Sequence, residues 1–464
     1  MRFMYRPFSD LWRSSGGGWI TVLGVFFVFL TFTLPLFSLT LPWKFQWLWT
    51  LQLEDDVLVK ENTEKDNVAI HELINRMRAG APPETWREPA LKVGGLELRE
   101  RDLRGANLRR AKLPNAILTE INLQGADLTR AKLPWAELER VQMQEATLTE
   151  AILYEVKLGD IDLSGSKAEN INLTGAEMIG VLLNNAKWRG ARLDDAVLDS
   201  FRATDTDLTN ASLKNADATS AHLNGVLLNN ATLRGTILEG ASLERTDLSL
   251  AKMAAVVLAR AHMEKASLDS ADLRGATLRA AVFDDTRFRN ANLTGADLRE
   301  TEPRRANLKG AGLGLADLRG AKLLMPPLTT LERKNLGASP QDWSSIEERP
   351  CRTRKENKED EFCLEQWKSR IPQEHPCLMT KAWGPCLGEK DLAEYDKYLA
   401  DFLADLACED ESLARPVIRR AESIRKDEPQ RPITTLLHER LTMQDCPAWN
   451  ELSAKTRESF ERIR

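Results

Sequence analysis

Cysteine is absent from the first 350 residues of this 464-residue chain, and histidine and tyrosine are scarce throughout, with five and four copies. The sequence also lacks a glycine-rich phosphate loop, a His-Glu-x-x-His motif and a Gly-x-Ser-x-Gly motif. These absences argue against a nucleotide-binding enzyme, a zinc protease and a serine hydrolase. We therefore expect no catalytic residues, no metal site and no cofactor, and the chain is not expected to be an enzyme.

A large excess of one charge is also lacking, since 64 Lys and Arg face 69 Asp and Glu, for a net charge of −5. A strongly basic nucleic-acid-binding protein is therefore excluded, and we expect no nucleic-acid partner. Hydrophobic residues make up 42% of the chain and charged residues 29%, which excludes a wholly disordered protein.

One long uncharged run lies near the N-terminus, over residues 20–41. It is long enough to cross a hydrocarbon core of about 30 Å as a helix. Arginines precede it and acidic residues follow it, which predicts a cytoplasmic N-terminus. We expect a single-pass anchor in a bacterial inner membrane, with residues 1–18 cytoplasmic, residues 19–42 in the bilayer and the remainder periplasmic.

A cleaved signal peptide is the alternative for this run. Its apolar part is longer than a usual signal sequence, and Phe37-Ser38-Leu39-Thr40 makes a poor cleavage site. Residues 43–95 are then expected to be a juxtamembrane helical linker and a cap for the repeat domain that begins at residue 96. Within them, Val57–Ala79 has the apolar spacing of a helix that Gly80 and the pair Pro82-Pro83 end.

A five-residue repeat runs without interruption from about Leu98 to Leu323. Its central position, called i, falls on every residue number that ends in 3 or 8, and 34 of the 45 central residues from Leu103 to Leu323 are Leu. Position i−2 is Ala in 29 of the same 45 repeats. Position i−1 is often Asp or Asn, and position i+2 is often Gly or Asn.

A helix cannot keep a period of five on one face, because it turns once every 3.6 residues. In an extended segment, positions i−2 and i point the same way and i−1 points to the opposite side. Two further residues can make a corner, where Gly and Asn tolerate positive φ. The pattern therefore predicts a β-solenoid that hides a layer of Leu and a layer of Ala.

This pattern resembles the pentapeptide-repeat family, whose motif is Ala-(Asp/Asn)-Leu-x-x. The resemblance covers about half of the chain and implies a mainly β fold, namely a right-handed, four-sided β-helix over residues 96–327 with four repeats per coil. It implies about eleven coils and a rod of about 55 Å. One role known in the family is to mimic DNA and inhibit topoisomerases. That alternative requires a strongly acidic rod, whereas Leu96–Met325 carries 31 basic and 32 acidic residues.

With four repeats per coil, the outward charges sort by face. One face is mainly basic and is our candidate partner-binding face, with Arg192, Lys214, Arg234, Lys252 and Arg274. The next face is mainly acidic but also turns apolar Val197, Ile237 and Val257 outward. The alternative interpretation is a mixed, solvated surface without a partner.

The C-terminal part is expected to comprise a linker, residues 328–350, and a separate α-helical domain, residues 351–464. Helices are predicted over Asp391–Cys408, Ser412–Ile424 and Ile433–Met443. In an exported chain, its six cysteines predict disulfides, although free thiols or zinc are alternatives and the pairing stays open. These possible disulfide cysteines are Cys351, Cys363, Cys377, Cys386, Cys408 and Cys446.

Taken together, the sequence predicts a membrane-anchored, non-enzymatic scaffold or protein-interaction module that presents a β-helical rod to a protein partner. The alternatives are the DNA-mimicking inhibitor and an activity in the C-terminal helical domain. That domain can also serve only as a cap, because open coil ends would otherwise stack with other chains.

Overall fold

The computed structural model describes two main parts of the chain. The first is residues 72–317, apart from 74, 78, 91–93, 302–305, 309–310 and 314, and the second is residues 389–443. Six single residues beyond them are also described, at positions 449, 452, 457, 458, 460 and 461. No helix among the described residues combines the length and the apolar character needed to cross a membrane. The predicted anchor, residues 19–42, and the linker, residues 328–350, lie outside the described residues.

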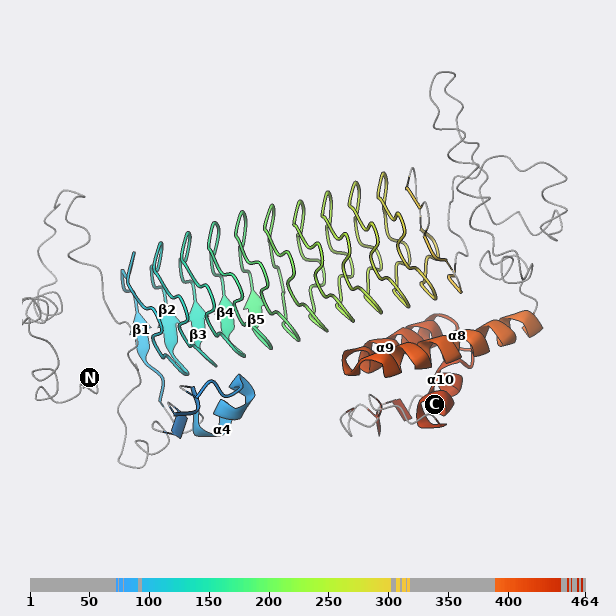
Figure 1. Ribbon diagram of the computed structural model, residues 1–464, viewed down its shortest axis with the longest axis horizontal. Coiled ribbons are helices and arrows are strands. Elements are labelled where there is room, and N and C mark those ends of the chain that lie inside the picture. The colour runs from blue at the N-terminus through green and yellow to red at the C-terminus, as the bar shows by residue number, and fades with distance from the viewer. Residues whose placement is uncertain are drawn as a thin grey trace, which may run out of the picture.

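The first part is a parallel β-solenoid (Figure 1). Five strands pair side by side in chain order, and they are β1 (Glu97–Arg99), β2 (Ile117–Thr119), β3 (Glu137–Glu139), β4 (Lys157–Gly159) and β5 (Glu177–Ile179). Each pairs in parallel with residues 20 further along the chain, as Leu98 does with Leu118. Isolated bridges continue this register to the pair Asp297 and Asp317. The prediction of four five-residue repeats per coil is thereby confirmed.

Position i+2 of the repeat forms the corner of the coil. Every residue at this position from Glu100 to Glu300 has positive φ, whether or not it is Gly. The amide of the following residue closes the turn, as in Ala126 N–H donating to Leu123 O at 3.0 Å. Gly and Asn are common there because they adopt this conformation at little cost.

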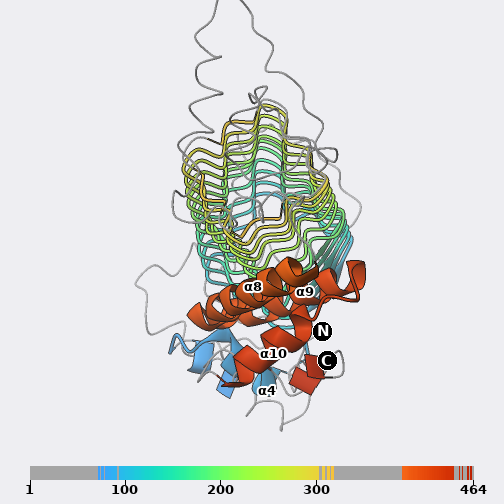
Figure 2. The same ribbon diagram turned by 90° about the vertical axis from the view of Figure 1, so that its right-hand side faces the viewer.

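The core of the rod consists of the two layers that the repeat predicts, and it lies inside the stacked coils seen in Figure 2. The side chains at i and at i−2 are buried from coil to coil, as Leu213 and Ala211 illustrate. Trp188 replaces a Leu at i and lies one coil beyond the small Ala168, and both residues are fully buried. Large and small residues thus offset each other within a closely packed core.

The first coils carry a small N-terminal cap on their side, formed by residues 72–90 and including η2 (Pro83–Trp86) and α4 (Arg87–Ala90). Leu73, Met77, Trp86 and Ala90 are buried together against the solenoid residues Trp135 and Ile152. Hydrophobic contacts with the solenoid surface therefore hold the cap in place.

The second part consists of three helices, α8 (Glu389–Glu409), α9 (Glu411–Asp427) and α10 (Ile433–Met443). The three predicted helices are confirmed. Asp410 caps α9, because its carboxylate accepts a hydrogen bond from Ser412 N–H at 2.9 Å. Arg425 and Lys426 in the last turn of α9 complement the helix dipole.

These three helices, which we call the helical region, do not stand apart from the rod as the sequence suggested. Leu399, Leu403 and Val417 are buried in one hydrophobic cluster with Ala254 and Ala255 of the solenoid. Small, apolar side chains at these two corner positions leave room for the helices. Figures 1 and 2 both show α8 and α9 lying against the last coils of the rod, on the side where the cap lies against the first coils.

Candidate protein-interaction surface

The structure brings the five residues of the candidate partner-binding face to one side of the rod. Arg192 and Lys252 belong to the same row of the solenoid, since bridges connect Arg192, Ser212, Thr232 and Lys252 in successive coils. Lys214, Arg234 and Arg274 lie one position after the central residue of the same side, at the start of the corner. The grouping by face follows directly from the 20-residue coil.

The helical region binds two of these five residues. Arg274 Nη1 donates to Glu409 Oε1 at 2.6 Å, and Arg234 pairs with Asp410. The hydrogen bonds that Arg274 donates to the carboxylates of Asp272 and Glu409 raise the pKa of Arg274 above its ordinary value. Binding of an outside protein by the other three, Arg192, Lys214 and Lys252, stays a prediction.

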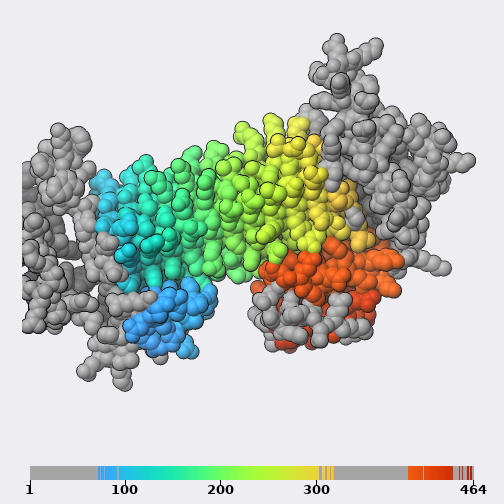
Figure 3. Space-filling model, viewed as in Figure 1, coloured from blue at the N-terminus to red at the C-terminus, as the bar shows by residue number. Residues whose placement is uncertain are grey.

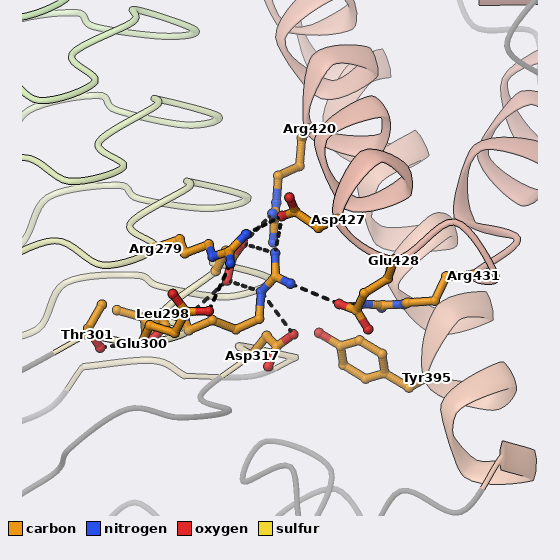
Figure 4. A network of polar contacts seen from close by, with 12 residues as sticks. Arg279, Leu298, Glu300, Thr301, Asp317, Tyr395, Arg420, Asp427, Glu428 and Arg431 are labelled. Carbon is orange, nitrogen blue, oxygen red and sulfur yellow. Dashed lines mark hydrogen bonds and ion pairs between the residues drawn. The ribbon is translucent and has the colours of Figure 1, made fainter.

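A buried ionic network lies at the centre of the contact between the helical region and the solenoid (Figure 4). Asp297 is fully buried, and both of its carboxylate oxygens accept from Arg299, at 2.8 Å each. Arg420 of α9 donates to the same carboxylate at 2.8 Å. Burial alone would raise the pKa of Asp297, but the two arginines hold that pKa far below its ordinary value.

Arg299 extends the network to the end of α9, because its Nη1 donates to Glu428 Oε1 at 2.9 Å. Arg279 donates to Asp427 at 2.7 Å in the same way. The buried Tyr395 of α8 lies next to these pairs (Figure 4). Its hydroxyl donates to Leu315 O at 2.9 Å. Side chains from two helices and several coils are thus joined in one contact.

Close approach of the helices depends on glycines in one corner row of the solenoid. A Cβ atom added to Gly235 would lie 2.1 Å from Cγ of Pro416, and one added to Gly295 would lie 2.4 Å from Cε1 of Phe402. Real atoms do not approach that closely. Arg419 also donates to Gly235 O at 3.0 Å, so the bare backbone of this row is itself part of the contact.

Sequence reasoning missed this contact and therefore missed the roles of Arg279, Arg299 and Arg420. The signal that could have indicated it is local. Asp297 and Asp317 take outward positions of a repeat whose outward positions are normally solvated, and a helix rich in arginine follows later in the chain. A buried pairing between the two was not evident from spacing alone.

Metal binding finds no support in the parts of the chain that are described, where no three His, Cys, Asp or Glu residues are placed to hold an ion. Cys408, half-buried on α8, is the one cysteine among the described residues. The other five predicted disulfide cysteines lie outside them. The disulfides therefore stay a prediction.

Comparison with known proteins bears on the solenoid. The family model described as Pentapeptide repeats matches in 8 copies, over residues 102–140, 126–165, 176–215, 211–249, 246–285 and 286–323. The solved structure of HetL, a pentapeptide repeat protein involved in heterocyst differentiation regulation in the cyanobacterium Nostoc, is 29% identical. That match covers 52% of this chain and 96% of HetL, with a TM-score of 0.26.

QnrB1, a plasmid-mediated fluoroquinolone resistance protein, is 17% identical over 53% of this chain and 97% of its own, with a TM-score of 0.23. A pentapeptide repeat protein from the thylakoid lumen of Arabidopsis thaliana is 27% identical over 21% of this chain and 65% of its own, with a TM-score of 0.15. The comparison with curated proteins gave no match. The eight matched copies, together with the 20-residue coils, show that this chain belongs to the pentapeptide repeat family through its solenoid.

Proposed function

We propose that this chain is a non-enzymatic scaffold that residues 19–42 tether to a bacterial inner membrane and that binds a protein partner on the side of its solenoid. One observation carries the proposal. The cap and the helical region, which are far apart in sequence, both pack on the same side of the rod. This side of the rod carries exposed charged residues, small corner residues and backbone hydrogen-bond acceptors. It already binds two other folded segments of the chain, the cap and the helical region.

The regular backbone supports the proposal further. Coils follow each other at about 4.8 Å, so equivalent side chains form fixed rows that another protein can match. The near-balance of charge along the rod is unlike the dense, uniform negative charge of DNA. We therefore favour a protein partner over the DNA-mimicking alternative.

Partner binding is tested with the full chain, purified from membranes of the source bacterium after mild cross-linking. Arg192→Glu and Lys252→Glu reverse two exposed charges of the candidate partner-binding face. We expect the amount of the cross-linked partner to fall about tenfold, because rim charges steer association. Arg202→Glu, also exposed but in a different row of the coil, is the matched control. Equal yields from all three variants would contradict the proposed face.

The tether is tested separately. Carbonate extraction is expected to leave the full chain in the membrane fraction and to release a chain that lacks residues 1–42. Added protease is expected to cut the solenoid-bearing part only after the outer membrane has been opened. Release of the full chain by carbonate would contradict the anchor while leaving partner binding untouched.

A further inference from the structure

The first coil of the solenoid, residues 97–116, is the most basic part of the rod. It carries six Lys or Arg residues against three Asp or Glu, whereas the next coil, residues 117–136, carries two of each kind. None of the nine coils over residues 137–316 has a net charge above +1. Figure 3 shows the first coils, in light blue, beside the cap, in darker blue, with the orange helical region at the other end of the rod.

Three arginines of the first coil are exposed and make no ion pair with any described residue. They are Arg99, Arg101 and Arg110. In the corner row of Arg110, the next residue is Arg130, which already pairs with Glu150 at 2.7 Å. The first coil therefore presents cations that are available to an outside anion.

Arg101 marks the place where the core of the rod ends. It occupies position i−2 and is the one charged residue at that position from residue 101 to residue 321. One coil further on, Ile121 takes the same position and is fully buried, whereas Arg101 is exposed. Leu98 and Leu103, at position i, are only half-buried. This end of the rod therefore combines partly exposed apolar side chains with exposed arginines.

The surface of an anionic bilayer matches both properties. Guanidinium groups bind phosphate oxygens through two parallel hydrogen bonds, and each cation near an anionic membrane strengthens binding. Partly exposed leucines bury apolar area at the boundary between headgroups and acyl chains. A second copy of this chain fits less well, because a head-to-head contact would place arginines against arginines.

The order of the chain also favours the bilayer. The first coil is the part of the solenoid nearest in sequence to the predicted anchor, residues 19–42. Residues 43–71 connect the anchor to the cap, and the cap lies beside the first coils. A tether raises the effective concentration of lipid headgroups at the near end of the rod.

We propose that the arginines of the first coil bind the phosphate groups of anionic lipids in the bilayer that holds the anchor. The proposal rests on the tether in the proposed function and adds a second, ionic contact with the same membrane. Arg99, Arg101 and Arg110 supply the cations, while Leu98 and Leu103 meet the headgroup boundary. The contact holds the first coil at the membrane and leaves the candidate partner-binding face of the later coils accessible to a protein.

The test uses the full chain, reconstituted through its anchor into bilayer discs. One kind of disc contains phosphatidylcholine alone, and the other an equal mixture with phosphatidylglycerol. Hydrogen exchange of residues 97–116 is measured by mass spectrometry, because amides such as Leu103 N–H, which donates to Asn122 O at 2.7 Å, exchange when the coil opens.

We expect the exchange of residues 97–116 to be at least about fivefold slower in the anionic discs, which is the factor that about one bound arginine contributes. Residues 197–216, in the middle of the rod, should exchange equally in both kinds of disc. A high salt concentration should remove the difference at the first coil, because salt screens exposed charges.

Arg99→Glu combined with Arg110→Glu is expected to abolish the difference between the two lipids. Arg202→Glu combined with Arg245→Glu is the matched control, because it reverses two exposed charges in the middle of the rod. Arg110 and Arg245 also share the corner conformation, with φ of 55° and 56°. Thermal melting establishes that both double variants keep the fold, and the salt dependence of the unmodified chain gives a second test that needs no variant.

Several results would overturn the proposal. Equal exchange in the two lipids, a difference that survives high salt, or an equal loss of the difference in both double variants would each do so. Protection that depends on protein concentration and not on lipid charge would assign this end to a second copy of the chain. Protection by a DNA duplex in neutral discs, as strong as that by the anionic lipid, would assign the arginines to a nucleic acid instead.

The behaviour of the anchor separates this proposal from the proposed function. If the full chain stays in the discs but its first coil exchanges equally in both lipids, the tether stands and the headgroup contact fails. If the chain does not enter the discs, flotation with vesicles of the same two compositions replaces them. Flotation with the anionic vesicles alone, lost when Arg99→Glu and Arg110→Glu are combined, would then support the headgroup contact without the anchor. Absence of flotation would overturn both.

Discussion

At the scale of single residues, each corner of the solenoid requires one residue in the left-handed region, whatever its side chain. Leu250 has φ of 60° and Asn230, in the same row one coil earlier, has φ of 58°. The left-handed conformation costs an ordinary L-residue about 1–2 kcal/mol, whereas Asn tolerates it better. The repeat thus accepts strain at corners such as Leu250 in order to keep its period.

We expect Leu250→Asn to stabilise the solenoid by about 0.5–1 kcal/mol, because Asn adopts this φ more readily. The side chain of Leu250 is 56% exposed, so little apolar contact is lost. The midpoint of urea unfolding measures the effect. Asn230→Leu is the matched reverse change and is expected to lower the midpoint. A lower midpoint for Leu250→Asn would contradict this account of the corners.

A second residue-scale prediction concerns the inner layer of leucines. Leu213→Asp places a carboxylate between adjacent coils, where the neighbours at the same position are Leu193 and Leu233, both buried. We expect the free energy of unfolding of the solenoid to fall by at least about 3 kcal/mol, because the new charge is buried without a partner. Thermal unfolding monitored by circular dichroism measures it. His222→Asp, at an exposed outward position, is the control and should melt within a few degrees of the unmodified chain.

At the scale of elements, the contact between α9 and the solenoid depends on a missing side chain. Gly235→Ala is expected to displace α9, because the new Cβ would lie 2.1 Å from Pro416. Gly125→Ala is the matched control, since both glycines have φ of 67° and a Cβ at Gly125 meets no atom within 4 Å. Hydrogen exchange should therefore increase across residues 411–427 in Gly235→Ala alone. Equal exchange in both variants would show that only backbone strain matters.

The buried network predicts how the helical region responds to acid. The pKa of Asp297 is lower in the folded state than its usual value near 3.9. The ionised carboxylate therefore makes its complete contribution to the stability of the folded state at neutral pH. That contribution is lost as the pH falls below about 4 toward the folded-state pKa. We expect proteolysis of the helical region to be constant between about pH 5 and pH 8 and to increase below about pH 4.

Asp297→Asn removes the carboxylate that Arg299 and Arg420 share while both remain buried. We expect the free energy of unfolding of the helical region to fall by about 3–5 kcal/mol. We also expect proteolysis to increase less when the pH falls below about 4. Asp199→Asn, at an exposed position, is the control and should leave the free energy of unfolding and the acid dependence of proteolysis unchanged. If proteolysis of Asp297→Asn increased below about pH 4 as strongly as that of the unmodified chain, carboxylates other than Asp297 would be responsible for the acid dependence.

The elements differ in how far the sequence predicts them. The solenoid follows from its repeat, because burial of Leu at i and Ala at i−2 is decided within a few residues and within one coil. The three helices follow equally from their apolar spacing. The packing of α9 on the rod does not, because Gly235 and Pro416 lie far apart in sequence and carry no shared pattern. The 20-residue coil puts the five residues of the candidate partner-binding face on one side, and partner binding by them stays a prediction. The pairing of Arg234 with Asp410 depends on packing that the sequence does not predict.

At the scale of the whole molecule, the 20-residue coil fixes the angle between the cap and the helical region. Deleting residues 161–180 removes one coil, so both parts should stay on one side and approach each other by about 4.8 Å. Deleting residues 161–165 should instead turn the later coils by a quarter of a revolution. Fluorescence energy transfer between labels at Glu88 and Lys397, both exposed, measures the distance. Equal distances in the two variants would contradict a rigid four-repeat coil.

The way the helical region spans the last coils has a mechanical consequence. Coils that touch only their neighbours peel away one at a time when a load is applied along the axis. Contacts from Arg234 to Asp410, the N-cap of α9, and from Asp297 to Arg420 of α9 fasten several coils to one helix. A pull on the rod should therefore unravel the middle coils in small steps, while the fastened end yields later and in a single larger event.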